Sequence, residues 1–327
     1  MSNSSETLDP IRLEIIANGL RSIADECFVA LMRSAYSTNI KERKDHSIAI
    51  VDRAGRLVVQ AELTLPIHIA SMGGLMKCVI EKFGDDINDG DIFIANDPHT
   101  AGGTHLPDIN YAMPIFIDGE IVAFVCNIAH HADIGGMVPG SMAGGMSEIY
   151  QEGLRIPVVR LFKKGEMQED IMDILMLNVR VPEERRGDHN AQIASCRLGE
   201  RRFKEVVKVH SLPSVLSAFD EIISRTNQRM KDAISQIPEG VYQFKDFMDS
   251  DGLETYDIPI CLKLTVAGDR VHLDFAGTSS QVKGNINTTL NAVQASVNYA
   301  LIGALDSEMP SNQGVLDAVD IDCEPGT

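Results

Sequence analysis

The sequence predicts an α+β fold of mixed helices and antiparallel β-hairpins, with a C-terminal β-meander-plus-helix region. Three observations support this prediction. Apolar residues recur at helical spacing after residue 10, tight turns join short apolar runs between residues 47 and 133, and closely spaced strand-like runs begin at Val241. The chain of 327 residues also exceeds one typical domain of roughly 100–200 residues. We therefore expect an α+β domain over 1–210 and a helix-plus-β-meander region over 211–327, with a soft boundary within 210–240.

The first helix is predicted from its start signals and its apolar stripe. Asp9 can cap the helix, and Pro10 suits the first turn because its missing N–H would have no partner there. The apolar residues that follow fall on one helical face; they are Leu13, Ile16, Leu20, Ile23, Cys27 and Leu31. This stripe predicts a helix that packs on a core.

The next elements are predicted to be strands and one helix. SIAIVD (47–52) and RLVVQA (56–61) are typical of two strands joined by a turn at Arg53-Ala54-Gly55. Residues 71–83 are predicted to be a helix, because a glycine directly follows the last apolar position. Residues 91–95 form a short predicted strand that leads into a histidine-rich stretch.

Four of the nine histidines lie between residues 96 and 133, beside several aspartates. A two-residue turn at Asp118-Gly119 predicts a hairpin there, since Asp-Gly between apolar runs is a strong hairpin signal. That turn would place Pro107 opposite His130. The side chains expected to converge at the open end of this hairpin are His105, Asp108 and His130.

The register of this hairpin has one alternative. Pro114 lies inside the first strand and lacks a backbone N–H, so a bulge there would shift the pairing by one residue. The cluster would remain at the same end in either register. His105 and Asp108 are three residues apart with Pro107 between them, so a turn must bring their side chains together.

Two imidazoles and one carboxylate predict a metal or acid–base site, because such a donor set leaves coordination positions open. It suits a divalent Zn²⁺ or Mn²⁺ that polarises a carbonyl or activates water, and also non-haem Fe(II). The structural alternative is that the three side chains cap and brace the glycine-rich loop that follows. Nearby candidates for a fourth ligand or an orienting partner are His99, His131 and Asp133.

The glycine-rich stretch 134–147 has neither helical nor strand periodicity. It is therefore expected to be a loop, either a lid over the end of the hairpin or a plain connection. From Val241 onward the sequence predicts a β-meander. Further helices are expected at 168–178, at 183–209, from a cap at Ser214 to about Gln236, and at 291–305.

Composition and charge exclude several classes of function. A net charge of −18 argues against nucleic acid, whose phosphates require a basic face. The charged residues at 39–47, among them Lys41, Arg43 and Asp45, are expected to form a solvated face. No apolar run suits a membrane span, and the N-terminus lacks the apolar core of an export signal. Six cysteines without a CxxC pair fit reduced thiols, so the expected localisation is cytoplasmic.

Several segments between about 39 and 287 resemble the hydantoinase B/oxoprolinase family, which includes the B-type subunit of N-methylhydantoinase. The chain is also similar to a subunit type of acetone and acetophenone carboxylases. The matching segments are NIKERKDHSIAIVDRAGRLVVQAE, PIHIASM, NDPHTAGGTHLPDI, AHHADIGGMVPGSM, QEGLRIPVV, NVRVPEERRGDHNAQIASCRLGERR and DFAGTSSQVKGNIN.

The resemblance implies one subunit of an ATP-dependent hetero-oligomer that acts on a small cyclic amide or ketone. A kinase-like A-type partner would bind ATP and Mg²⁺ and phosphorylate the substrate oxygen. The B-type subunit would hold a divalent metal, and the family's metal site maps onto His105, Asp108 and His130. Asp45 and Glu152 are candidate general bases in this scheme. The sequence has no GxxxxGK[ST] loop and no GxGxxG after a strand, which agrees with ATP binding on another chain.

Hydrolysis of a cyclic amide is the first functional hypothesis, because phosphorylation of an amide oxygen creates a good leaving group. Carboxylation of the acetone or acetophenone type, with bicarbonate as co-substrate, is the alternative. A non-catalytic assembly subunit is the second alternative, and the resemblance gives no support to an oxygenase. Family members of this type are much longer, so the chain is expected to continue into a further C-terminal part. His68, flanked by apolar residues, is expected to be a core histidine.

Overall fold

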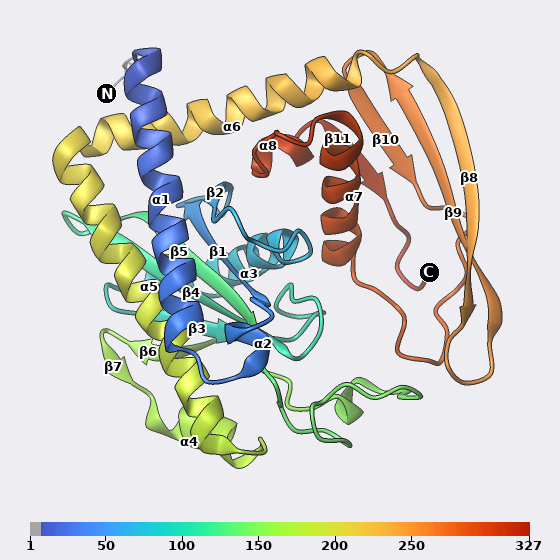
Figure 1. Cartoon of the computed structure of the whole chain (residues 1–327), viewed down its shortest axis with the longest axis horizontal. Coiled ribbons are helices and arrows are strands. Elements are labelled where there is room, and N and C mark those ends of the chain that lie inside the picture. Colours follow the sequence, from blue (N-terminus) through green and yellow to red (C-terminus); the bar gives the residue numbers. More distant parts are fainter. Residues whose placement is uncertain (1–7) are drawn as a thin grey trace.

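The structure, a computed structural model, describes residues 8–327 and confirms the α+β class (Figure 1). Two sheets organise the chain, one of seven strands and one of four. The polar N-terminal segment, for which no export signal is expected, lies mainly outside the described residues. Within residues 8–327 no helix has the length and apolar character needed to cross a membrane.

The seven-stranded sheet has the order β2-β1-β5-β4-β3-β6-β7, and neighbouring strands are antiparallel throughout. The predicted hairpin, β4–β5, lies at its centre. The strands are β1 (His46–Asp52), β2 (Leu57–Gln60), β3 (Ile92–Ala95), β4 (Asp108–Ile117), β5 (Glu120–His130), β6 (Val159–Lys163) and β7 (Glu166–Met167).

Helices cover both faces of this sheet. On one face lie α1 (Pro10–Ser34) and α5 (Pro182–His210), and on the other lies α3 (His68–Phe83) (Figure 1). Successive residues of β1 point to opposite faces, so Ile48 packs in the cluster with α1 and Ala49 in the cluster with α3. Cover on both faces explains why β1 is a continuous buried run rather than an alternating one.

The central hairpin takes the predicted alternative register. The simple pairing of Pro107 with His130 is wrong by one residue, because Asp108 lies opposite His130. The register shifts just after Ile115, beside Pro114, where β5 contains one extra residue. A bulge next to the proline is the physical reason, since proline cannot donate to the strand ladder.

Two helix starts differ from the prediction. Helix α3 begins at His68 rather than at residue 71. Helix α6 (Leu212–Ile234) begins with Ser211 in the cap position, so Ser214 already lies in its first turn. The remaining short elements of this part are α2 (Thr38–Lys41), two 3₁₀ turns at Gly84–Asp86 and Ile149–Gln151, and α4 (Glu169–Leu177). Strands β6 and β7 occupy a stretch for which the sequence predicts no strand.

The four-stranded sheet has the order β11-β10-β9-β8, with β10 and β11 parallel and the other pairs antiparallel. Helix α7, helix α8 and the end of α6 pack on it. The elements of this region are β8 (Gly240–Ser250), β9 (Tyr256–Ala267), β10 (Arg270–Asp274), α7 (Leu290–Leu305), α8 (Gln313–Leu316) and β11 (Val319–Asp322).

Helix α6 belongs to two hydrophobic cores. Phe219, in its first half, packs in the cluster under α1, whereas Met230 and Ile234 pack in the cluster under the four-stranded sheet. Figure 1 shows this helix running across the top of the molecule from one part to the other. A division of the chain at 210/211 stays a prediction, because half of α6 packs on the part that precedes it.

Candidate metal centre

The starts and ends of several elements meet at one edge of the seven-stranded sheet. Strand β5 ends at His130, β4 begins opposite it at Asp108, and β1 begins directly after Asp45. Antiparallel neighbours run in opposite directions, so the starts of β1 and β4 must lie beside the end of β5. Helix α3 brings its first residue, His68, to the same edge.

The predicted trio is assembled at this edge. One donor atom from each of His105, Asp108 and His130 lies within 4.8 Å of the others. His105 Nε2 is 3.2 Å from Asp108 Oδ1, and the two imidazole centroids are 5.0 Å apart. The Asp108 N–H donates to the His105 carbonyl at 3.1 Å, which is the turn that the spacing requires.

The residues of the trio fit a divalent cation. Asp108 Oδ2 accepts the hydroxyl hydrogen of Thr104, whereas the buried Oδ1 contacts His105 Nε2 at 3.2 Å and accepts no well-aligned hydrogen bond from the described residues. A buried carboxylate oxygen without a well-aligned donor costs free energy. A cation between the two imidazoles and this oxygen would remove that cost. The donor set suits Zn²⁺, Mn²⁺ or Fe²⁺.

The charges around Asp108 keep it ionised. Burial alone would raise its pKa, but the facing rings of His105 and His68 outweigh burial and hold the pKa of Asp108 well below its usual range. For His105, burial would lower the pKa, and the Asp108 carboxylate reverses this and raises it. Asp108 is therefore a carboxylate at neutral pH, the form that a metal ligand requires.

A second group of donors shares Asp108 with the trio. Asp45 and His68 each place a donor atom within 4.8 Å of one another and of Asp108. His68 Nε2 lies 3.6 Å from Asp45 Oδ1 and 3.7 Å from Asp108 Oδ2. His68 is buried, as expected, with 1% of its surface exposed. Its ring, however, faces two carboxylates instead of apolar side chains.

The charged stretch at 39–47 is only partly the solvated face that its sequence predicts. Lys41 and Arg43 are exposed. Asp45 is partly buried, with 30% of its side chain exposed, and it faces His68. Only the pairing of β1 with β5 reveals this position, because nothing in the local sequence marks Asp45 as different from its neighbours.

The other sequence candidates have different partners. His131 donates its Nε2–H to Gln192 at 2.8 Å, away from the trio. Asp133 is paired with Arg180. Glu152 belongs to neither donor group, but it lines the same cavity as His105 and its charge favours the protonated form of that imidazole.

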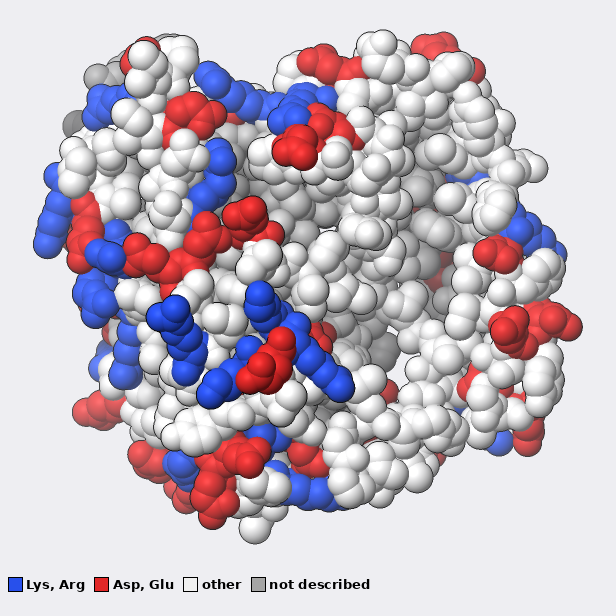
Figure 2. Space-filling model, viewed as in Figure 1, with Lys and Arg blue, Asp and Glu red and all other residues white. Residues whose placement is uncertain are grey.

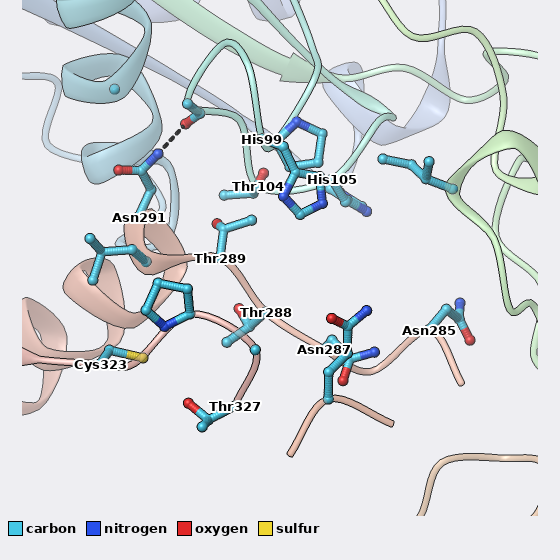
Figure 3. A pocket seen from close by; sticks show the side chains of 18 of the residues that line it. His99, Thr104, His105, Asn285, Asn287, Thr288, Thr289, Asn291, Cys323 and Thr327 are labelled. Carbon is cyan, nitrogen blue, oxygen red and sulfur yellow. Dashed lines mark hydrogen bonds between the residues drawn. The ribbon is translucent and has the colours of Figure 1, made fainter. Parts of the chain in front are cut away.

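A cavity of about 840 Å³ opens beside the trio, and His105 and Thr104 form part of its wall. This volume lies within the range of small-molecule sites, roughly 300–1,000 Å³. The face in Figure 2 is hollowed between the two parts of the molecule, and the side chains around the hollow are mostly uncharged. Figure 3 shows His99, Thr104 and His105 on one side of the cavity and Thr288 and Thr289 on the other.

The ion pair between Asp133 and Arg180 fixes the base of the glycine-rich loop. Asp133 accepts the N–H groups of Gly135 and Gly140 at 2.9 and 3.0 Å. Arg180 contacts Asp133 at 3.0 Å and also donates to three carbonyls of the loop. At the far side, Asn285 donates to the carbonyl of Ala143 at 3.2 Å. The loop therefore connects the trio to the C-terminal part of the molecule.

Arg180→Ala is expected to loosen this loop and to leave the rest of the fold intact. Hydrogen bonds to charged groups contribute about 1.5–3 kcal/mol, so proteolysis within 134–147 should become roughly tenfold faster, which corresponds to about 1.4 kcal/mol. Limited proteolysis with mass spectrometry measures this. Arg186→Ala is a matched control, because Arg186 is exposed to a similar extent, 43% against 40%, and among the described residues its one ion pair is with Asp173 at the surface. Equal cleavage rates in the two variants would contradict the expectation.

The fold and the site together define a class of protein: an α+β protein with a two-histidine, one-carboxylate group at a sheet edge, beside a cavity. The chain belongs to the hydantoinase B/oxoprolinase family, whose model matches residues 9–327. The resemblance found in the sequence is thus confirmed.

Two relatives illustrate the range of the family. Caprolactamase subunit beta of Pseudomonas jessenii is 30% identical over 98% of this chain and 54% of its own length. The 5-oxoprolinase 1 of Arabidopsis thaliana is 31% identical over 98% of this chain and 27% of its own length. The chain therefore spans about half or less of these relatives.

Two solved structures share the fold. The crystal structure of ATP-dependent caprolactamase from Pseudomonas jessenii matches with a TM-score of 0.92 at 30% identity, covering 98% of this chain and 55% of that chain. A nucleotide-free structure of acetone carboxylase matches with a TM-score of 0.91 at 22% identity, covering 98% of this chain and 44% of that chain. The second likeness concerns the fold alone.

Proposed function

We propose that this chain is the metal-bearing B-type subunit of an ATP-dependent hydrolase of cyclic amides, of the hydantoinase, oxoprolinase or lactamase type. A kinase-like A-type partner would use ATP and Mg²⁺ to phosphorylate the substrate oxygen within a hetero-oligomer. The observation that supports this most is the group of His105, Asp108 and His130 beside a cavity in a member of this family.

The comparisons favour a cyclic amide over a ketone as the substrate class. The relatives at 30–31% identity are a caprolactamase subunit and a 5-oxoprolinase, both named for ring amides. The likeness to acetone carboxylase lies at 22% identity. An unactivated amide is a poor electrophile, and a phosphorylated oxygen is a good leaving group, so activation on a partner chain suits this chemistry.

The roles of this chain's own residues follow from their positions. The trio would hold a divalent Zn²⁺, Mn²⁺ or Fe²⁺, which when bound can polarise a substrate oxygen or lower the pKa of a water. Asp45 is the first candidate to accept a proton, because its carboxylate lies beside the trio and is partly open to solvent. Glu152 is the second candidate, since it lines the cavity with His105.

Reconstitution with the kinase-like partner tests this proposal. A panel of lactams and hydantoins is offered to the complex with ATP, and we expect at least one ring to be opened. Mass spectrometry detects the ring-opened product. A parallel arm supplies ketones and labelled bicarbonate. Incorporation of label into a ketone would replace hydrolysis by carboxylation. A complex that opens no ring and fixes no label, with no metal on this chain, would instead indicate an assembly subunit.

A further inference from the structure

His68 is the one side chain of the two donor groups to which the proposed reaction gives no role. It is 1% exposed and sits between the trio and the candidate base, 3.7 Å from Asp108 Oδ2 and 3.6 Å from Asp45 Oδ1. Two roles are compatible with this position. The ring could bind a second metal ion with Asp45 and Asp108, or it could present an N–H to the two carboxylates.

The partners of the other ring nitrogen distinguish these roles. His68 Nδ1 lies 2.8 Å from Ser47 Oγ. The same Oγ accepts the backbone N–H of Leu65 at 3.0 Å. A serine hydroxyl has one hydrogen to donate and two lone pairs that accept, and the described residues offer that hydrogen no acceptor other than Nδ1. Nδ1 therefore accepts, and the neutral ring carries its proton on Nε2, the nitrogen that faces the two carboxylates.

His130 shows how a ligand in the same site is held differently. Its Nδ1 lies 2.9 Å from the carboxamide Nδ2 of Asn39. A metal-ligating histidine donates its second ring N–H to a neighbouring acceptor, and a carboxamide can supply that acceptor by turning its oxygen to the ring. Ser47 Oγ could accept from His68 only by leaving its own buried hydroxyl hydrogen without an acceptor among the described residues. The site is thus built for coordination at His130 and for donation at His68.

The N–H of His68 faces two carboxylates that repel each other. Asp45 and Asp108 are two carboxylates whose oxygens lie within 4.8 Å of a shared imidazole nitrogen and of each other. Like charges at such a distance repel one another. Both distances from His68 Nε2 exceed that of a hydrogen bond, so its N–H lies between two acceptors and reduces their repulsion without being committed to either.

We propose that His68 is a positioning residue whose Nε2–H holds Asp45 against the trio and orients Asp108, and that it is not a metal ligand. This proposal rests on the metal-dependent function proposed above. Without the donor, Asp45 would turn toward solvent, away from Asp108, and the trio would lose part of its fixed geometry.

Nitrogen NMR of the full chain tests the protonation state independently of metal and partner. With ¹⁵N-labelled histidine, the His68 signals are identified by their loss in His68→Gln. We expect the Nε2–H tautomer, both before and after addition of Zn²⁺ or Mn²⁺. Ser47→Ala should shift the ring toward a mixture of tautomers. An Nδ1–H tautomer in the wild-type chain, or loss of the Nε2 proton when metal is added, would overturn the proposal.

Metal titration tests the positioning role. Glutamine keeps an N–H donor on a side chain of similar reach, whereas leucine keeps volume and loses the donor. We expect His68→Leu to bind Mn²⁺ or Zn²⁺ roughly 10–100-fold more weakly with an unchanged stoichiometry of one, as is usual when an orienting partner is lost. His68→Gln should stay within about threefold of the wild type, a change of well under one tenfold step.

The outcomes separate the two proposals. Two metal ions per wild-type chain and one in His68→Gln would show that His68 is a ligand, as would equal losses in both variants. An affinity of His68→Leu equal to that of the wild type would exclude a positioning role. A wild-type chain that binds no metal would overturn the proposed function, and the tautomer measurement would still decide the state of His68.

Discussion

Asp108→Asn is expected to abolish metal binding and ring opening together. Asparagine keeps the size of the side chain but removes the negative charge that two facing imidazoles stabilise. It also replaces one carboxylate oxygen by an N–H₂ group, which cannot coordinate a cation. We expect metal affinity to fall by more than roughly 100-fold, the upper limit usual for loss of an orienting partner. Calorimetric titration and elemental analysis after dialysis measure the loss.

Asp52→Asn is the matched control for this experiment. Asp52 is also a buried aspartate, at 4% exposure, and it lies at the opposite end of β1 from the trio, where it pairs with Arg56 at 2.6 Å. This variant should lose some stability and keep its metal. Stoichiometric metal in Asp108→Asn, or ring opening by a reconstituted complex that contains no metal, would contradict the assignment of the trio.

Gly102→Ala is expected to have the second largest effect, on the free energy of unfolding. Gly102 has φ of +73°, and a Cβ there would lie 2.4 Å from the backbone carbon of Gly74 in α3. A left-handed backbone costs about 1–2 kcal/mol for a residue with a side chain, and overpacking against fixed backbone adds about 1–3 kcal/mol. Urea denaturation with linear extrapolation measures the loss.

Gly119→Ala separates the two contributions. Gly119 has φ of +85° in the β4–β5 turn, and a Cβ there would meet nothing within 4 Å. This variant should lose only the backbone part, so the difference between the two variants reports the close approach of Gly102 to Gly74. Equal losses would show that the loop can move away from α3 without cost.

The consequence of Gly102→Ala extends to the cavity. Asn291, at the start of α7, donates to the Gly102 carbonyl at 3.1 Å, the dashed bond in Figure 3. The loop that ends at His105 is thus fixed on one side by α3 and on the other by the C-terminal part. A displaced loop should weaken metal binding as well as stability.

Much of the site was predictable because its geometry depends on local turn chemistry. The Asp118-Gly119 turn takes positive φ at both residues, as a two-residue hairpin turn requires. That turn alone brings His130 near Asp108, and the one-residue shift beside Pro114 does not separate them. Residue types and spacing were therefore sufficient for the trio.

The rest of the site depends on contacts that no local pattern contains. His68 is surrounded in sequence by apolar residues, and only the packing of α3 on the sheet brings it to Asp108. Asp45 joins the site because β1 pairs with β5 rather than with β2 alone. Strand β7 has two residues, too few for any alternation to be visible. These features require the tertiary fold.

The shared helix α6 has a consequence for how this family can vary. An α-helix turns by about 100° and rises by about 1.5 Å per residue. One residue inserted near its middle would therefore rotate the four-stranded sheet relative to the seven-stranded one and distort the cavity between them. The length of α6 is thus tied to the shape of this cavity. Natural changes in the shape of the cavity should instead accumulate in the loops around it, such as 147–152 and 281–289, where an added residue alters one wall and leaves His105, Asp108 and His130 in place.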